Sequence, residues 1–140
     1  MTTEAEKESF LTQLRSQVGN TGDTITARDA VNQSTIRNWC DAVSESNPHY
    51  LDFEIAEEGP HGQIVAPPAM LQVWSMPGLI MGQQPQRSKD PSSATYAMLD
   101  EAGFVSVVAT NVEYVFHRYL KLGDVISGRT KLVDVSEAVS

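Results

Sequence analysis

Apolar residues recur at helical spacing in the first half of the chain. Those of residues 34–44 follow the i, i+3, i+4, i+7 spacing of one helix face, which predicts a helix capped by Ser34: Ile36, Trp39, Cys40 and Val43. Residues 4–18 predict a second helix, because Thr3 can cap its start and Gly19 follows its end. The chain therefore begins as a helical protein with only a short β-prone stretch, residues 22–31, between the two helices.

The second half of the chain has a different pattern. Residues 104–116 and 125–135 are rich in Val, Tyr, Phe and Thr, and a Leu-Gly-Asp turn signal at residues 122–124 separates them. This arrangement predicts two long strands joined in a hairpin. Residues 82–93 hold Gln, Pro, Ser and charged side chains, which indicate a loop.

Helices first and strands last predict an α+β fold, and 140 residues predict a single domain spanning residues 1–140. An antiparallel sheet that wraps a helix needs more strands than these. Either a partner supplies the further pairing, or the sequence is one part of a larger unit.

Charge and composition narrow the function classes. A net charge of −8 disfavours sequence-independent nucleic-acid binding, and no apolar run reaches the length of about 20 residues that a membrane span needs. The N-terminus lacks the features of a signal peptide, so we expect a cytoplasmic protein. Cys40 is the single cysteine and is expected to be a buried thiol rather than a nucleophile. No His, Asp or Glu set has metal-ligand spacing, so no metal site is predicted.

The run from residue 45 to residue 71 carries the most distinctive pattern. A turn at Asn47-Pro48 precedes Asp52, and residues 52–58 predict one or two helical turns before an irregular glycine loop at residues 59–62. Ala66-Pro67-Pro68 then opens a predicted buried helix over residues 69–79, because proline is tolerated in a first helical turn.

These residues resemble the hydratase motif of the MaoC-like hotdog family, over about residues 4–135 of the chain. Catalytic members carry G-D-x-N-P-[LIV]-H-x-D, in which the Asp and His activate water for addition to an enoyl thioester. On that pattern Glu45 stands at the Asp and Tyr50 at the catalytic His, while Asn47, Pro48 and Asp52 are retained. The resemblance implies a hotdog fold, with an antiparallel sheet wrapped around a central helix, as half of a double hotdog.

The helix entry is altered as well. Pro67 and Pro68 have no amide N–H, so no oxyanion hole can be built from the amides at these positions. The chain is most similar to noncatalytic halves of two-subunit bacterial steroid side-chain enoyl-CoA hydratases, followed by two-subunit acyl-carrier-protein dehydratases. The resemblance implies no catalytic residue here and no cofactor, a coenzyme A thioester as substrate, and a MaoC-like hydratase partner with the intact Asp/His motif. The residues it places against the acyl group are Pro67, Met70, Leu71 and Trp74.

Other interpretations of the same residues stay open. Glu45 can be a solvated acid or a base assisted by His49, Tyr50 a buried aromatic or a proton donor, and His61 a solvated loop residue or a ligand contact. Two alternative functions follow. One is a self-sufficient homodimeric hydratase or thioesterase using Glu45 or Asp52, and the other is an acyl-binding interaction module without turnover.

Overall fold

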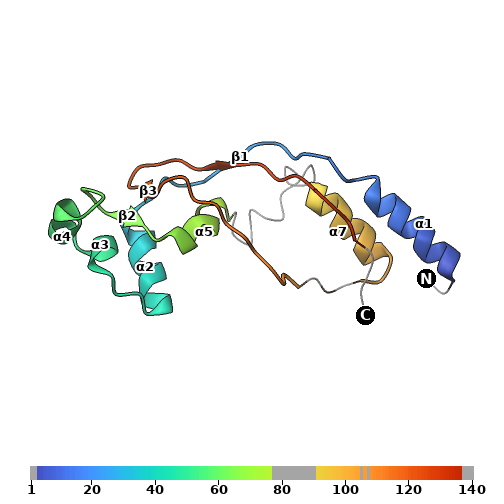
Figure 1. Ribbon diagram of the computed structural model, residues 1–140, viewed down its shortest axis with the longest axis horizontal. Coiled ribbons are helices and arrows are strands. Elements are labelled where there is room, and N and C mark those ends of the chain that lie inside the picture. Colours follow the sequence, from blue (N-terminus) through green and yellow to red (C-terminus); the bar gives the residue numbers. More distant parts are fainter. Residues whose placement is uncertain (1–2, 77–90, 105, 107, 137–140) are drawn as a thin grey trace. The chain divides into compact units, whose positions relative to one another are not determined.

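The structure, a computed structural model, describes residues 3–76, 91–104, 106 and 108–136 (Figure 1). It divides into two compact units. The terminal unit comprises residues 1–24, 79–112 and 129–140, and the motif unit comprises Ile25–Gly78 and Glu113–Gly128. The candidate site lies within the motif unit.

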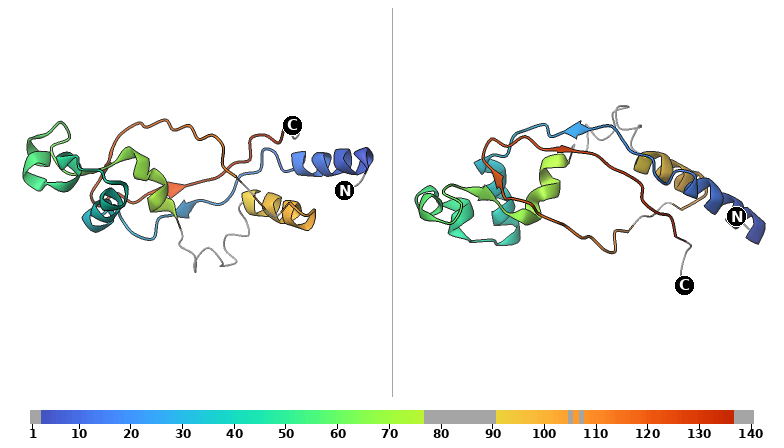
Figure 2. Two further views of the ribbon diagram at one scale, coloured as in Figure 1. Left: turned by 90° about the horizontal axis from the view of Figure 1, so that it is seen from below. Right: turned by 45° about the horizontal axis from the view of Figure 1, so that its top comes forward.

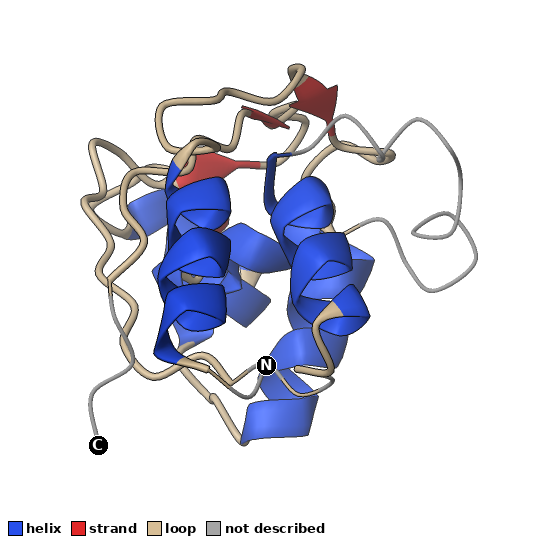
Figure 3. Ribbon diagram, turned by 90° about the vertical axis from the view of Figure 1, so that its right-hand side faces the viewer, coloured by secondary structure: helices blue, strands red, loops and turns tan. Residues whose placement is uncertain are grey.

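Two helices, α1 (Glu4–Arg15) and α7 (Pro91–Glu101), lie side by side in the terminal unit (Figures 1 and 3). Thr3 caps α1 as predicted, and it does so within a capping box: the Thr3 hydroxyl accepts from the Glu6 amide, and the Glu6 carboxylate accepts from the Thr3 amide. Helix α7 is absent from the predictions, and its first residues fall in the predicted loop. Its Ala, Met and Leu residues favour a helix but form no clear apolar stripe.

The helices of the motif unit are short except for α2 (Gln33–Val43). Asn32 rather than the predicted Ser34 caps α2, because the Asn32 side-chain oxygen accepts from the Thr35 amide at 2.9 Å. Ser44 ends the helix in the left-handed region, at φ 58°. Two helical turns follow, α3 (Pro48–Leu51) and α4 (Phe53–Glu58), and the second confirms the helical prediction for residues 52–58.

The predicted helix at residues 69–79 begins as a 3-10 turn, η1 (Pro68–Met70), and continues as α5 (Leu71–Ser75). Met76 is extended, so the helix ends earlier than the pattern indicated; the predicted residues 77–79 lie outside the described part of the chain. Because the proline at position 77 restricts the conformation of the residue before it, an extended Met76 is the expected outcome.

Within the described residues, four two-residue strands form two antiparallel pairs. Strand β1 (Ile25–Thr26) pairs with β4 (Ser127–Gly128), and β2 (Val65–Ala66) pairs with β3 (Leu120–Lys121) (Figure 2). The β1 strand confirms the strand prediction for residues 22–31 in a shorter form.

The predicted long hairpin is wrong. The described part of residues 104–116 contains no strand, and β3 and β4 pair with earlier segments instead of each other. The turn between them is real: Gly123 has φ 88°, and the Asp124 carboxylate accepts from the Lys121 amide at 2.8 Å. Strand propensity reflects how side chains fit a pleated surface and does not specify the partner, so the pattern located β-prone segments without their pairing.

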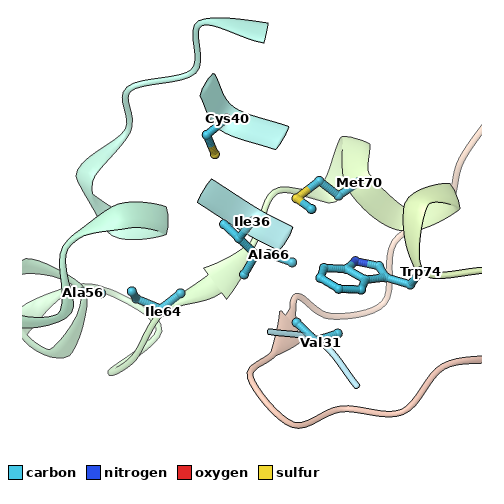
Figure 4. Close-up of a cluster of buried hydrophobic side chains, with 8 residues drawn as sticks. All are labelled: Val31, Ile36, Cys40, Ala56, Ile64, Ala66, Met70 and Trp74. Atoms are coloured by element: carbon cyan, nitrogen blue, oxygen red, sulfur yellow. The ribbon is translucent and has the colours of Figure 1, made fainter. Parts of the chain in front are cut away.

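The core of the motif unit joins α2 to the segment around β2 and α5 (Figure 4). The buried members of this core lie in the chain between the residue before Asn32 and the end of α5: Val31, Ile36, Cys40, Ala56, Ile64, Ala66, Met70 and Trp74. Leu120, Leu122 and Ile126 pack against it from the β3–β4 region. Cys40 is fully buried, as predicted, and burial raises the pKa of its thiol.

Candidate functional site: an apolar pocket beside a capping motif

The polar residues of the motif hold backbone amides. Asn47 caps α3, its side-chain oxygen accepting from the His49 amide at 3.1 Å, and Pro48 occupies the first helical turn. Asp52 caps α4, with one carboxylate oxygen accepting from the Glu54 and Ile55 amides at 2.9 and 3.1 Å. The Asn-Pro and Asp that this chain shares with the hydratase pattern therefore fix the path of the backbone between α2 and α4.

Glu45 also bonds to the backbone of its own turn. One of its carboxylate oxygens accepts from the Asn47 amide at 2.9 Å, and its own amide donates to the Cys40 carbonyl at 2.9 Å. The side chain is half-buried. A carboxylate engaged with a local amide has one fewer lone pair to offer to a water molecule.

Tyr50, at the position of the family's catalytic histidine, packs against the core cluster and is half-buried. Burial, together with the nearby Tyr119, Glu45 and Cys40, raises the pKa of its hydroxyl. The phenol therefore stays neutral at physiological pH, and it does not reproduce the proton exchange that an imidazole offers near pH 7.

The two histidines of this region, His49 and His61, lie in different environments. The His49 Nδ1 atom is buried without a hydrogen-bond partner among the described residues, and its ring lies against Gly59, where an added Cβ would come within 2.5 Å of it. His61 stacks at a tilt on Tyr119, with ring centroids 4.2 Å apart. Among the described residues, neither histidine side chain makes a hydrogen bond or ion pair with the Glu45 carboxylate, which bonds to the Asn47 amide.

A pocket of about 350 Å³ opens beside the helix entry. One side is formed by the segment around the two prolines, and the other by the chain leading into β3: Ala66, Pro67, Pro68 and Leu71, with residues 115–120. Most of these side chains are apolar, and His117, Arg118 and Tyr119 supply its polar or titratable groups. The Arg118 guanidinium donates to the Asp124 carboxylate and to the Tyr119 carbonyl, which orients it along this wall and lowers the pKa of Asp124.

The four residues predicted to contact an acyl group fall in two places. Pro67 and Leu71 line the pocket, whereas Met70 and Trp74 lie in the core cluster at 0% and 5% exposure (Figure 4). Helical geometry separates them, because successive residues of a helix project about 100° apart around its axis, so Met70 can enter the core while Leu71 faces the pocket.

The far wall, residues 115–120, was missing from the predicted site. Val115 and Phe116 had been interpreted only as part of a strand, and nothing local to residues 115–120 indicates that they approach Pro67 and Pro68. The pairing of β3 with β2 brings this wall to the prolines, because it places Leu120 opposite Ala66.

Among the described residues, no group of three or more His, Cys, Asp or Glu side chains is placed to hold a metal ion. Within the same residues, no helix has both the length and the apolar character that crossing a bilayer demands.

The α+β fold and the partly retained motif point to one class, the MaoC-like hotdog proteins. The family described as FAS1-like, dehydratase domain region, matches residues 16–140, and the chain belongs to this family of MaoC-like hotdog domains.

Among characterised proteins, the chain is 47% identical over 109 residues to the 3-oxo-4,17-pregnadiene-20-carboxyl-CoA hydratase alpha subunit of Mycobacterium tuberculosis, covering 78% of this chain. It is 37% identical over 130 residues to a probable enoyl-CoA hydratase alpha subunit of Thermomonospora curvata, covering 92% of this chain. The chain spans 34% and 41% of the lengths of these two relatives.

One solved structure is similar over nearly the whole chain. A chain in the crystal structure of the ChsH1-ChsH2 complex from Mycobacterium tuberculosis superimposes with a TM-score of 0.78 at 37% identity, covering 96% of this chain and 73% of its own. The likeness supports the predicted hotdog fold class.

Proposed function

We propose that the chain is the noncatalytic, acyl-binding part of a heteromeric (R)-specific enoyl-CoA hydratase. In this proposal a MaoC-like partner with the intact Asp/His motif hydrates the double bond, and this chain holds a bulky acyl group, with a steroid side chain as the favoured class. The thioester is the substrate and no cofactor is required. The cytoplasmic location remains a prediction.

The observation that carries the proposal is the apolar pocket beside Pro67 and Pro68. Its walls are mostly apolar side chains from β2, η1 and α5 and from residues 115–120, with His117 and Arg118 among them, so most of the lining suits hydrocarbon. A volume of about 350 Å³ falls within the range of about 300–1,000 Å³ typical of small-molecule sites. Pro67 and Leu71 are the predicted contacts that line it, so we assign acyl contact to them and core support to Met70 and Trp74.

The state of the motif supports a noncatalytic role. A hydratase needs a general base and acid directed at a water molecule and a double bond. Here Glu45 bonds to the Asn47 amide, Asp52 caps α4, and the hydroxyl of Tyr50 has a raised pKa. The chemistry is therefore assigned to the partner, and the alpha-subunit names of the two relatives fit an enzyme with a second subunit.

The net charge of the chain supports the same assignment of roles to this chain and its partner. The phosphates of coenzyme A favour basic side chains, but this chain carries a net charge of −8, and Arg118 at the pocket is already bonded to Asp124. We therefore assign the coenzyme A contacts mainly to the partner subunit.

The proposal is tested by reconstitution. The chain is purified alone and after co-expression with a MaoC-like hydratase subunit that has the intact motif, and hydration of enoyl-CoA substrates with short and with polycyclic acyl groups is measured. We expect the complex to hydrate enoyl-CoA and the isolated chain to show no activity. The complex should also prefer the polycyclic substrate to the short one more strongly than the partner subunit does by itself. Turnover by the isolated chain would favour the self-sufficient enzyme, and no turnover with any such partner would favour the acyl-binding module.

A further inference from the structure

The loop between α4 and β2 is held in place at both of its glycines (Figure 1). The Gly59 amide donates to the Ala56 carbonyl at 3.2 Å, and the Gly62 amide donates to the Gly59 carbonyl at 3.1 Å. Gly62 has φ 65°, a conformation that favours glycine, and the side of Gly59 that would carry a Cβ is occupied by the His49 ring. His61 lies within this turn, so the backbone on both sides fixes where its side chain begins.

The His61 side chain makes its contact through the face of its ring. Its centroid lies 4.2 Å from that of Tyr119, and the two rings are tilted by 43°. Among the described residues, the side chain makes no hydrogen bond or ion pair, and it is half-buried. The contact therefore joins two segments that are far apart in the sequence, the loop before β2 and the residue before β3.

Tyr119 is a wall residue of the acyl pocket. Its backbone is anchored, because its carbonyl accepts from the Arg118 guanidinium at 2.9 Å and the next residue, Leu120, pairs with Ala66. Its side chain is still 38% exposed, so burial alone does not fix the direction of the ring. The stack on His61 supplies that constraint, and it does so from outside the pocket lining.

We propose that His61 is a positioning residue of the acyl pocket. By stacking on Tyr119 it fixes this wall, and the fixed wall makes the pocket select a rigid, polycyclic acyl group over a flexible, linear one. This inference rests on the proposed function for the identity of the ligand. A rigid ligand cannot adapt to a displaced wall and binds best where the wall is already in place, whereas a linear chain can bend around a ring that has moved.

The test compares variants of the reconstituted complex. His61→Ala removes the stacking ring, His61→Phe retains a ring without the imidazole nitrogens, and Tyr119→Leu keeps the wall apolar but removes the ring that His61 contacts. Phe53→Ala is the matched control, because it removes an aromatic ring that is 59% exposed on α4 and outside the pocket. Calorimetry measures Kd for a saturated polycyclic acyl-CoA and for octanoyl-CoA, kinetics give kcat and KM for the corresponding enoyl-CoA substrates, and circular dichroism verifies folding.

We expect His61→Ala to weaken binding of the polycyclic probe by roughly three- to tenfold, the range that one aromatic contact supplies, and to raise KM for the polycyclic substrate to match. The value of kcat should stay within about twofold, since no proton transfer is assigned to this residue, and octanoyl-CoA binding should change by less than about twofold. His61→Phe and Phe53→Ala should both bind as the unaltered complex does. In the Tyr119→Leu background, His61→Ala should add no further loss, because the residue through which it acts is gone.

A second readout needs no variant. The His61 ring should displace the NMR signals of the Tyr119 ring protons in the unaltered complex, and that displacement should persist when the polycyclic probe binds. Its disappearance on binding would contradict a stack that holds the wall for the ligand.

Unchanged preference between the two probes in the His61→Ala complex would overturn the inference and leave the proposed function intact, and so would equal losses for both probes. A further loss from His61→Ala in the Tyr119→Leu background would indicate direct contact with the acyl group in place of positioning. Failure of His61→Phe to bind like the original would assign the effect to the imidazole nitrogens, which also contradicts the inference. A complex that binds the probes but hydrates no enoyl-CoA would contradict the proposed function alone, because the binding comparison requires no turnover.

Discussion

Residues 45–52 and the pocket beside Pro67 lie in the same compact unit but use their side chains in opposite ways. In the motif, polar atoms bond to backbone amides: Glu45 to Asn47, Asn47 to His49, and Asp52 to two amides of α4. In the pocket, apolar side chains face open space. The polar side chains of residues 45–52 are therefore engaged within the chain, whereas the pocket leaves apolar surface available to a ligand.

The comparison separates a structural role of the motif residues from a role in binding. Asn47, Pro48 and Asp52 matter as caps and turn residues whether or not chemistry takes place beside them. A chain can therefore keep part of a catalytic signature for folding alone. The functional surface then has to be found from geometry, which here directs attention to the pocket.

Neighbouring residues at the helix entry give the largest expected effect. Met70 is fully buried in the core, so Met70→Ala should lower the free energy of unfolding by about 2–5 kcal/mol through lost burial and a cavity. Leu71, which lines the pocket and is half-buried, should lose less than about 2 kcal/mol on the same change. Urea denaturation of both variants measures this, and equal losses would contradict the division between core and pocket wall.

A charge in the pocket should act on the ligand instead of the fold. In the reconstituted complex, Leu71→Asp should raise KM for a polycyclic enoyl-CoA by roughly 10- to 100-fold, because a carboxylate must be desolvated against hydrocarbon. The effect on a short-chain substrate should be smaller. Val43→Asp is the matched control, since Val43 is 53% exposed on α2 and outside the pocket. A Leu71→Asp complex with unchanged preference between the two substrates would place the acyl group elsewhere.

A smaller effect is expected at the motif. Asp52→Ala removes the cap of α4 and should cost about 1 kcal/mol of stability by urea denaturation, whereas Asp52→Asn should retain most of it because asparagine also caps helices. Stability of Asp52→Asn near that of the original chain, combined with loss of hydration by the complex, would identify the carboxylate as catalytic.

The sequence predicted α1 from its cap and α2 from its apolar stripe, although it placed the cap of α2 at Ser34 instead of Asn32, and it predicted the strand at β1. It did not predict α7, whose residues favour a helix without forming a stripe, nor the partners of β3 and β4. Strand pairing depends on contacts distant in sequence, such as Ala66 with Leu120, and no local pattern encodes them.

The candidate site was predicted in the same uneven way. The prolines are visible in the sequence because their missing N–H groups have a direct chemical consequence, and Pro67 does lie at the pocket. The resemblance grouped Met70 and Trp74 with Leu71 against the acyl group, and helical spacing cannot distinguish a core face from a pocket face when both are apolar. The wall at residues 115–120 depends on the β2–β3 pairing and could not be anticipated.

The central claim is that this chain binds the acyl group and performs no proton transfer. The most direct measurement is kcat/KM for a polycyclic enoyl-CoA in the reconstituted complex carrying Glu45→Gln together with Tyr50→Phe. Neither side chain is assigned a proton, so we expect a value within about threefold of the unaltered complex, against a loss of roughly 100-fold or more when the partner's catalytic Asp or His is replaced. A comparable loss from the Glu45 and Tyr50 changes, with the complex still assembled and folded, would contradict the account.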